Sequence, residues 1–592
     1  MISADPPANF CTACQLAHGY FRRPLRTVRK RFMRDPKLSP KSLAIAVLAT
    51  LLLLLSFVAP AVTSAASARH AMVVAEQELA AKIGLQIMAR GGNAVDAAVA
   101  TSLAVGLTNP SSCGIGGGGF MLIYWARTNK VYALDYRERA GALATPGLYI
   151  RDGKPIDDRT RNGAMAVAVP GEINGLYNAL HRFGTMQFSD VAAPTIALGR
   201  NGFPCGKHLA DEIERTRYAL AADPELKKVF LHSDGTPRKE GETIVEADLA
   251  HTLQTFDNHP ISHFYHGPVA RNLVNYLRPL GGVINIADLD DYKVYWREPL
   301  HHSYRGYDVY SMPPPSSGGA TVLESLAALS PGNIAGLGLN SPAYLARLIE
   351  ILRQGFADRA LFGDPNFVDV PIGFLLSPQH ISEMRARAFG KKSPPPAPVA
   401  QDHGTSQLCV VDEQGNVVSI TTTINTPFGA KLMVPKLGII LNNEMDDFGL
   451  SPDIGNAYGL RGSNPNAIGP GKRPVSSMSP TIVLRDHHPV LTLGGSGGPT
   501  IISGTLQVAL AILDAHLDPE RAVKLPRIHE QGSPDTVAVE AAMPNATIRA
   551  LMKMGYKVKI VPMLGAVQAI EISPQLLRGA FDPRKGGGAV GY

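Results

Sequence analysis

The sequence predicts an α+β fold in which packed antiparallel sheets are covered by helices. Apolar runs come in pairs joined by short polar turns, helical patterns precede and follow these pairs, and the regular strand–helix alternation of a doubly wound sheet is missing. The 592 residues are 45% hydrophobic and 18% charged, which is enough apolar material for a large core.

The elements expected first are two helices. In 76–90, apolar residues recur at helical spacing, and Gly91 is suited to end that helix. Asn93 can cap a second, more apolar helix over 94–106, which we expect to be buried.

A glycine cluster, 114–119, leads into an expected hairpin of strands 120–126 and 131–136. The cluster matches G-x-G-x-x-G, but a dinucleotide site needs a strand before the glycines and a helix after them. Because a strand follows here, we interpret the cluster as a site of close backbone packing.

The second half of the chain begins after a Pro-rich stretch, 391–398, which we interpret as a linker. Two β-rich runs, 405–411 and 417–424, follow it and suit a second hairpin. Further expected elements are strands at 438–441, 481–485 and 490–493 and a helix at 500–513.

The net charge of +7 comes from the N-terminus. Residues 1–41 contain nine Lys or Arg and two acidic residues, which leaves 48 charges of each sign in the rest of the chain. A neutral body offers no basic face, so nucleic-acid binding is not expected. We expect 1–41 to be a basic cytoplasmic tail.

The uncharged run 43–62 is long enough to span a bilayer, and small residues near 66–68 also suit signal-peptidase cleavage. Residues 42–68 are therefore expected to be a signal peptide or a membrane anchor. In both cases the body is exported to the periplasm or another extracytoplasmic space. Cys11 and Cys14 form a single C-x-x-C pair, a weak metal signal.

The Gly404–Thr405 junction stands between the linker and a predicted strand. If the chain were cut there, the freed amine of Thr405 would have a pKa of about 8 and could act as general base to its own hydroxyl. Glycine before it would permit the strained geometry of an N-to-O acyl shift.

A rival nucleophile is Ser496, in a G-x-S-x-G match between a strand and a helix. Asp514 and His529 follow in the chain order of a serine esterase. The same glycines have another use, because the backbone N–H groups of Gly497 and Gly498 could bind an oxyanion at the helix N-terminus.

Several motifs, taken together and in their order along the chain, resemble the γ-glutamyltranspeptidase (glutathione hydrolase) family. They are GGNAVDAA (91–98), GIGGGGF (114–120), DYRE (135–138), TSQLCVVD (405–412), LNNEMDDF (441–448), GKRPVSSMSPT (471–481) and DPR (582–584). The resemblance covers nearly everything after residue 71.

The resemblance implies a four-layer αββα sandwich of the N-terminal-nucleophile hydrolase type, made as an inactive zymogen. Cleavage between Gly404 and Thr405 would give a large subunit, 69–404, and a small catalytic subunit, 405–592. Thr405 would attack both its own peptide bond and the γ-glutamyl amide, Thr423 would hydrogen-bond to it, and Gly497 with Gly498 would form the oxyanion hole.

The implied substrates are glutathione and other γ-glutamyl compounds, with water or acceptor amino acids and dipeptides completing a hydrolase or acyltransferase cycle. Substrate-binding residues would be Arg137, Ser476 and Ser477 for the α-carboxylate, and Glu444, Asp447 and Asn425 for the α-ammonium group. Tyr458 would belong to a lid over 449–461. No metal or organic cofactor is expected. Two more functions stay open at this point, a cephalosporin-acylase-like amidohydrolase and a membrane-anchored protein that binds amino acids.

Overall fold

The computed structural model describes residues 64–332, 334–389, 404–450, 455–532 and 535–592. The expected basic tail, the apolar run 43–62, Cys11 with Cys14, and the Pro-rich linker lie outside these residues. Within the part that the structure describes, no helix is both long and apolar enough to cross a membrane.

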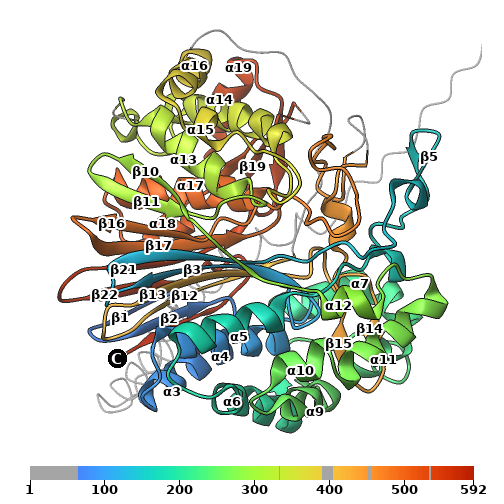
Figure 1. Ribbon diagram of the computed structural model, residues 1–592. Coiled ribbons are helices and arrows are strands. Elements are labelled where there is room, and N and C mark those ends of the chain that lie inside the picture. Colours follow the sequence, from blue (N-terminus) through green and yellow to red (C-terminus); the bar gives the residue numbers. More distant parts are fainter. Residues whose placement is uncertain (1–63, 333, 390–403, 451–454, 533–534) are drawn as a thin grey trace, which may run out of the picture. The chain divides into compact units, whose positions relative to one another are not determined.

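Two seven-stranded antiparallel sheets form the centre of the region 64–592 (Figure 1). Sheet A has the order β1 (Ala65–Ala68), β22 (Leu577–Ala580), β21 (Ala566–Ile572), β17 (His488–Ser496), β16 (Thr481–Arg485), β11 (Tyr307–Ser311), β10 (Leu300–Tyr304). Sheet B has the order β23 (Gly588–Gly591), β2 (Met72–Ala75), β12 (Ser406–Val411), β13 (Val417–Thr423), β3 (Gly118–Trp125), β4 (Lys130–Tyr136), β9 (Tyr295–Arg297).

The sheets stack face to face, and helices cover both outer faces (Figure 1). On sheet B lie α3 (Glu78–Ala89), α4 (Ala94–Thr108) and α5 (Glu172–Phe183), extended by α6 (Phe188–Asn201), α7 (Lys207–Ala222), α8 (Pro224–Phe230), α9 (Ala247–Phe256), α10 (Pro260–Tyr265), α11 (Pro268–Leu277) and α12 (Ile286–Asp290). On sheet A lie α13 (Gly318–Leu329), α17 (Thr500–Leu513) and α18 (Pro519–Lys524), with α14 (Pro342–Asp358), α15 (Ile372–Leu375), α16 (Pro378–Phe389) and α19 (Asn545–Lys553) beyond them.

Short elements complete the fold. The strands are β5 (Ile150–Arg151), β6 (Lys154–Pro155), β7 (Phe203–Pro204), β8 (Thr243–Ile244), β14 (Met433–Val434), β15 (Ile439–Ile440), β18 (Ile528–His529), β19 (Val537–Glu540) and β20 (Val558–Val561). The 3-10 turns that matter for the site are η5 (Arg359–Leu361) and η6 (Glu444–Asp447).

Apolar side chains from both sheets fill the space between them, and each outer helix layer has its own hydrophobic cluster. The inter-sheet cluster includes Met72, Val74, Phe120, Leu122, Cys409, Ile482 and Ile570. Because both faces of each sheet are covered, β12 and β13 are buried at every position, although both strands contain Ser, Gln or Thr residues.

The predicted α+β class and antiparallel sheets are confirmed. Asn93 caps α4 by accepting hydrogen bonds from the N–H groups of Val95 and Asp96, and the Asp96 side chain completes a capping box. Gly91 follows α3 with a positive φ of 95°.

The start of the described region is part of sheet A. The small residues Ala65–Ala68, placed within the expected signal or anchor segment 42–68, form strand β1 and pair antiparallel with β22. The folded body therefore includes these residues, because their backbone groups complete the edge of sheet A.

Candidate active site

The hairpin of β12 and β13 places two threonines opposite each other at its open end. Ser406 pairs with Thr422, so Thr405 and Thr423 are the next residues along the two antiparallel strands. Their hydroxyl oxygens lie 2.9 Å apart, and Thr405 is only 4% exposed. The Thr423 hydroxyl also accepts a hydrogen bond of 2.8 Å from the N–H of Asn425. The predicted contact between Thr405 and Thr423 is present.

The backbone around Thr405 is tightly constrained. Thr405 has a φ of 76°, a region that is costly for a β-branched residue, and its N–H donates to the carbonyl oxygen of Ser112 at 3.1 Å. A Cβ on Gly404 would lie 1.7 Å from the carbonyl oxygen of Asn425. Only glycine fits before Thr405 in this arrangement.

Lys585 reaches the same junction from the C-terminus of the chain. Its side chain is fully buried, and its ammonium group donates to the carbonyl oxygens of Gly404 at 3.1 Å and Thr405 at 3.0 Å. The carboxylate of Glu76, also buried, lies 4.0 Å from the same ammonium. Neither residue was singled out from the sequence. A lysine directly after the DPR motif was the available signal.

The two threonines line one small cavity together with most of the expected substrate-binding side chains. The residues around it are Arg137, Arg359, Thr405, Thr423, Asn425, Glu444, Asp447, Tyr458, Leu460, Ser476, Ser477, Met478, Gly498 and Ile501. Gly497 precedes Gly498 in the turn between β17 and α17, with φ values of 123° and 56°. Sheet A thus brings this turn to the cavity, while sheet B brings the threonines.

Arg137 is the centre of a buried ion-pair cluster. Its guanidinium group lies 2.7 Å from Glu444 and 2.6 Å from Asp447, with Glu138 at 3.4 Å. The DYRE motif at the end of β4 supplies Arg137, and η6 supplies the carboxylates of Glu444 and Asp447. The expected binding residues for the substrate's two charged groups are therefore paired with each other here.

Burial shifts the pKa values of the charged groups in this cluster. Burial raises the pKa of Glu444 well above its ordinary value and also raises the pKa of Asp447, with Arg137 opposing both effects. Burial likewise lowers the pKa of Arg359 to about 10.

Arg359 is a further residue of the cavity, and it was not predicted from the sequence. It follows α14 and donates from its guanidinium group to the hydroxyl of Ser317 at 2.9 Å and to the carbonyl oxygen of Ser476 at 3.4 Å. Ser476 and Ser477 therefore lie beside two guanidinium groups. Nothing in the local sequence of Arg359 marks it, because only the packing of α14 brings it to the cavity.

The side chains of Tyr458 and Asn425 contact each other. The Tyr458 hydroxyl donates to the side-chain oxygen of Asn425 and lies 3.0 Å from its carbonyl oxygen. A second cavity, of about 230 Å3, lies against the neighbouring residues Gly459 to Ser463 and shares Asp447 and Arg359 with the first. The predicted lid residue therefore lines the same cavity as the threonines, and the residues that follow it line the larger one.

The residues of the alternative serine-esterase triad have different hydrogen-bond partners. Ser496 donates to Glu76, Asp514 accepts from Tyr304 at 2.7 Å, and His529 contacts Ser503 at 2.9 Å. No hydrogen bond joins Ser496, His529 and Asp514 to one another among the described residues, so the geometry does not support a serine triad.

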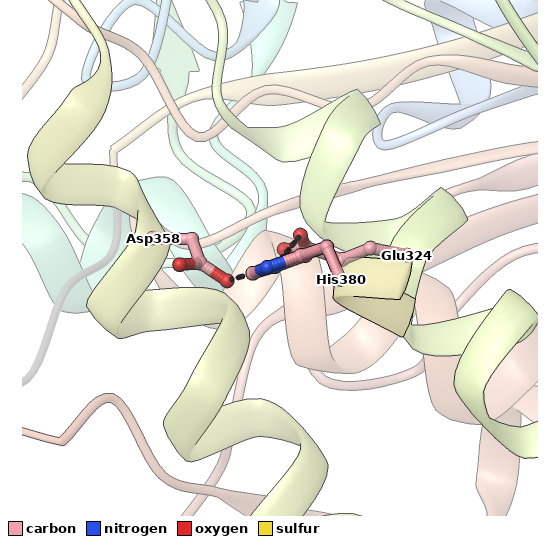
Figure 2. Close-up of side chains that lie close together, drawn as sticks. All are labelled: Glu324, Asp358 and His380. Atoms are coloured by element: carbon pink, nitrogen blue, oxygen red, sulfur yellow. Dashed lines mark hydrogen bonds and ion pairs between the residues drawn. The ribbon is translucent and has the colours of Figure 1, made fainter. Parts of the chain in front are cut away.

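Metal-ligand side chains come together in one place away from this cavity, among the described residues. Glu324, Asp358 and His380 offer ligand atoms that all lie within 4.8 Å of one another (Figure 2). They come from α13, α14 and α16, on the outer side of sheet A (Figure 1). This cluster was not predicted from the sequence, because its three members lie far apart in the chain.

Known proteins resemble the chain over most of its length. A family profile described as Gamma-glutamyltranspeptidase matches residues 80–592. The glutathione hydrolase proenzyme of Escherichia coli (strain K12) is 36% identical over 527 residues, covering 87% of this chain and 91% of that protein. The glutathione hydrolase proenzyme of Pseudomonas aeruginosa is 39% identical over 523 residues, covering 86% and 93%.

A solved structure is also similar to the chain over most of its length. The crystal structure of cephalosporin acylase from Bacillus halodurans superposes with a TM-score of 0.81 at 26% identity, covering 94% of this chain and 99% of that one. The family match includes strands of both sheets and every residue that lines the cavity. The chain therefore belongs to the γ-glutamyltranspeptidase family.

Proposed function

We propose that this protein is a self-processing γ-glutamyltransferase and glutathione hydrolase in which Thr405 is the nucleophile. The observation that carries the proposal is the buried Thr405 hydroxyl, 2.9 Å from Thr423, in a cavity that also contains Arg137, Glu444 and Asp447. Membership of a family whose relatives are named glutathione hydrolase proenzymes supports the same conclusion.

Maturation would begin with attack of the Thr405 hydroxyl on the carbonyl carbon of Gly404. The Gly404–Thr405 C–N bond breaks, the hydroxyl proton passes to the nitrogen, and an ester joins Gly404 to the Thr405 oxygen. Water then hydrolyses this ester, which leaves a Gly404 carboxylate and a free amine on Thr405. The positive φ of Thr405 favours this step, because cleavage releases the strain.

In turnover, the amine of Thr405 would act as general base to its hydroxyl, which attacks the γ-glutamyl carbonyl carbon. The amide C–N bond breaks, the amine product takes the proton, and a γ-glutamyl ester remains. Water or the amino group of an acceptor amino acid or dipeptide releases the γ-glutamyl group. The N–H groups of Gly497 and Gly498, at the start of α17, would stabilise the oxyanion.

The charged end of the substrate matches the ion-pair cluster. Its α-carboxylate would bind Arg137 with help from the hydroxyls of Ser476 and Ser477, and its α-ammonium group would bind Glu444 and Asp447. A zwitterion adds no net charge, so it can exchange partners within the existing pairs. The Asn425 side chain offers a neutral acceptor beside them.

The proposal also covers the fold, the two subunits and the export of the protein. The two stacked sheets covered by helices support an N-terminal-nucleophile hydrolase fold, with subunits 69–404 and 405–592 from one precursor. Export, with 43–62 as signal peptide or anchor, agrees with the charge distribution of the sequence. We propose no cofactor for the reaction.

A second candidate is amide hydrolysis of glutaryl-type side chains, which the similarity to a cephalosporin acylase favours. Glutaryl groups lack an α-ammonium group. They would leave Glu444 and Asp447 without a cationic ligand, so we prefer γ-glutamyl substrates.

The test is Thr405→Ala in the full-length protein. We expect the wild type to run as two chains, the smaller beginning at Thr405, and to release the amine from a γ-glutamyl anilide. Thr405→Ala should remain one chain without activity. Ser496→Ala serves as the control and should still be processed. Cleavage and activity in Thr405→Ala, or an active single-chain wild type, would overturn the proposal.

A further inference from the structure

A buried cluster outside the active-site cavity joins three helices of the layer on sheet A. Nε2 of His380 lies 2.9 Å from Oδ2 of Asp358 and 4.0 Å from Oε2 of Glu324 (Figure 2). His380 is in the first turn of α16, Asp358 ends α14, and Glu324 is inside α13.

A second observation concerns the Glu324 carboxylate. Oε2 of Glu324 is buried and has no hydrogen-bond partner, and the residue is only 1% exposed. A carboxylate oxygen deprived of both water and a donor is costly, and buried polar groups in proteins are nearly always satisfied. Figure 2 shows this carboxylate directed towards the His380 ring, on the side away from Asp358.

The surrounding packing keeps the carboxylate in place. Gly355 of α14 faces it, and a Cβ there would lie 2.9 Å from Oε1 of Glu324 and 2.6 Å from Thr321. The two helices can therefore approach closely only because position 355 is glycine. This close approach keeps the Glu324 carboxylate away from water.

We propose that Glu324, Asp358 and His380 bind one divalent transition-metal ion of the Zn2+ class. One imidazole nitrogen and two carboxylate oxygens are a donor set typical of such ions. Tetrahedral ligands at zinc bond lengths lie about 3.4 Å apart, between the shortest and longest separations in the cluster. Asp358 is the most exposed member, so a water molecule can supply a fourth ligand on its side.

The expected role is structural. The ion would link the end of α14 to α13 and α16, and Asp358 directly precedes Arg359, which contacts Ser317 and Ser476 at the cavity. A metal ion here would hold the helix that carries Arg359 without taking part in γ-glutamyl chemistry.

The experiment uses chelator-treated full-length protein titrated with Zn2+, with calorimetry for stoichiometry and a thermal melt. Glu324→Gln and His380→Gln should each bind one fewer equivalent than the wild type and lose the zinc-dependent rise in Tm. His301→Gln is the control, because His301 makes a similar 3.0 Å pair with Asp308 but is exposed. Without metal, Glu324→Gln should be at least as stable as the wild type, since it removes a buried carboxylate. Equal zinc binding and equal Tm shifts in all four proteins would overturn the proposal.

A separate observation concerns Lys585, and this second inference rests on the proposed self-processing at Thr405. The Lys585 ammonium donates to the carbonyl oxygen of Gly404 at 3.1 Å. That oxygen belongs to the peptide bond to be cut. The Glu76 carboxylate is a buried counter-ion 4.0 Å from the ammonium, beyond hydrogen-bond distance, so the N–H donors of Lys585 are directed to the two carbonyl oxygens in a water-excluded place.

We infer that Lys585 is the oxyanion-stabilising residue of the maturation step. When the Thr405 oxygen adds to the Gly404 carbon, negative charge develops on the carbonyl oxygen that Lys585 already contacts. A preorganised donor at such an oxygen contributes strongly in a buried site. The contact with the Thr405 carbonyl oxygen at 3.0 Å holds the ammonium in position.

The test follows the conversion of purified precursor to two chains over time. Lys585→Met should convert at least about 100-fold more slowly, a loss typical for one oxyanion donor. Lys585→Arg, which keeps a cationic donor, should convert at an intermediate rate. Lys82→Met, at an exposed lysine paired with Glu78, should convert normally.

Different results would overturn the role of Lys585 and the proposed function of Thr405. Wild-type conversion rates in Lys585→Met, or equal rates for the Met and Arg variants, would overturn the role of Lys585 while leaving Thr405 as nucleophile. Conversion of Thr405→Ala would instead overturn the proposed function itself.

Discussion

At the scale of single residues, the proposed chemistry depends on how the Thr405 hydroxyl is positioned. Thr423 contacts Thr405 at 2.9 Å and is itself held by the N–H of Asn425. Its hydroxyl can therefore orient the nucleophile in both maturation and turnover.

Thr423→Val removes this hydroxyl and keeps the shape of the side chain. We expect slower self-cleavage and a fall in kcat of about 10- to 100-fold, with a smaller effect on KM, because the lost contact orients the nucleophile and does not bind the charged end of the substrate. Steady-state kinetics on the processed fraction would measure this. Thr423→Ser, which restores the hydroxyl, should recover most of the rate. An unchanged kcat in Thr423→Val would contradict this role.

At the scale of elements, the β12–β13 hairpin and the β17–α17 turn bring the site together. The hairpin was predicted from two β-rich runs and a turn, and its register, with Ser406 opposite Thr422, places Thr405 beside Thr423. The α4 helix packs on these same strands, and the Ala94 N–H at its start donates to Asp412 in the hairpin turn. The start of α4 therefore supports the hairpin.

Asn93→Ala tests the contribution of this helix start. The substitution removes the hydrogen bonds that Asn93 accepts from Val95 and Asp96, so we expect a loss of about 1–2 kcal/mol in the free energy of unfolding. Denaturant unfolding would measure it, with exposed Asn201→Ala as the control. Equal stability of the two variants would show that the cap is dispensable.

At the scale of the whole molecule, buried acids connect the layers. Glu172, the first residue of α5, accepts hydrogen bonds of 2.8 Å from Ser102 in α4 and from Thr422 in β13. Burial raises its pKa to about 7, although both hydrogen bonds act in the opposite direction. Folding therefore favours the protonated form of this carboxyl group.

Stability should consequently depend on pH through Glu172. Its stabilising contribution is complete below its unfolded pKa of about 4.5 and is lost as pH rises through the folded value of about 7, with a slope of at most about 1.4 kcal/mol per pH unit. Glu172→Gln should remove this part of the slope between pH 5 and 7. Parallel pH profiles of the unfolding free energy for wild type and variant would contradict the assignment.

Much of the fold followed from local signals. The α+β class, the Asn93 cap, the central hairpin and the helix after β17 were all predictable, because strand pairing across a short turn and helix capping are set by nearby residues. The motifs also identified most residues of the cavity.

The Gly404–Thr405 junction after the linker, together with the motifs that resemble a known family, indicated Thr405 as the proposed nucleophile, and the hairpin register places it opposite Thr423. The distant side chains that join it become known only from the folded chain. Arg359 arrives from α14, Lys585 and Glu76 from opposite ends of the described residues, and the Glu324 cluster from three helices. These contacts depend on how separate elements pack, and such packing leaves no pattern in the local sequence of any one element.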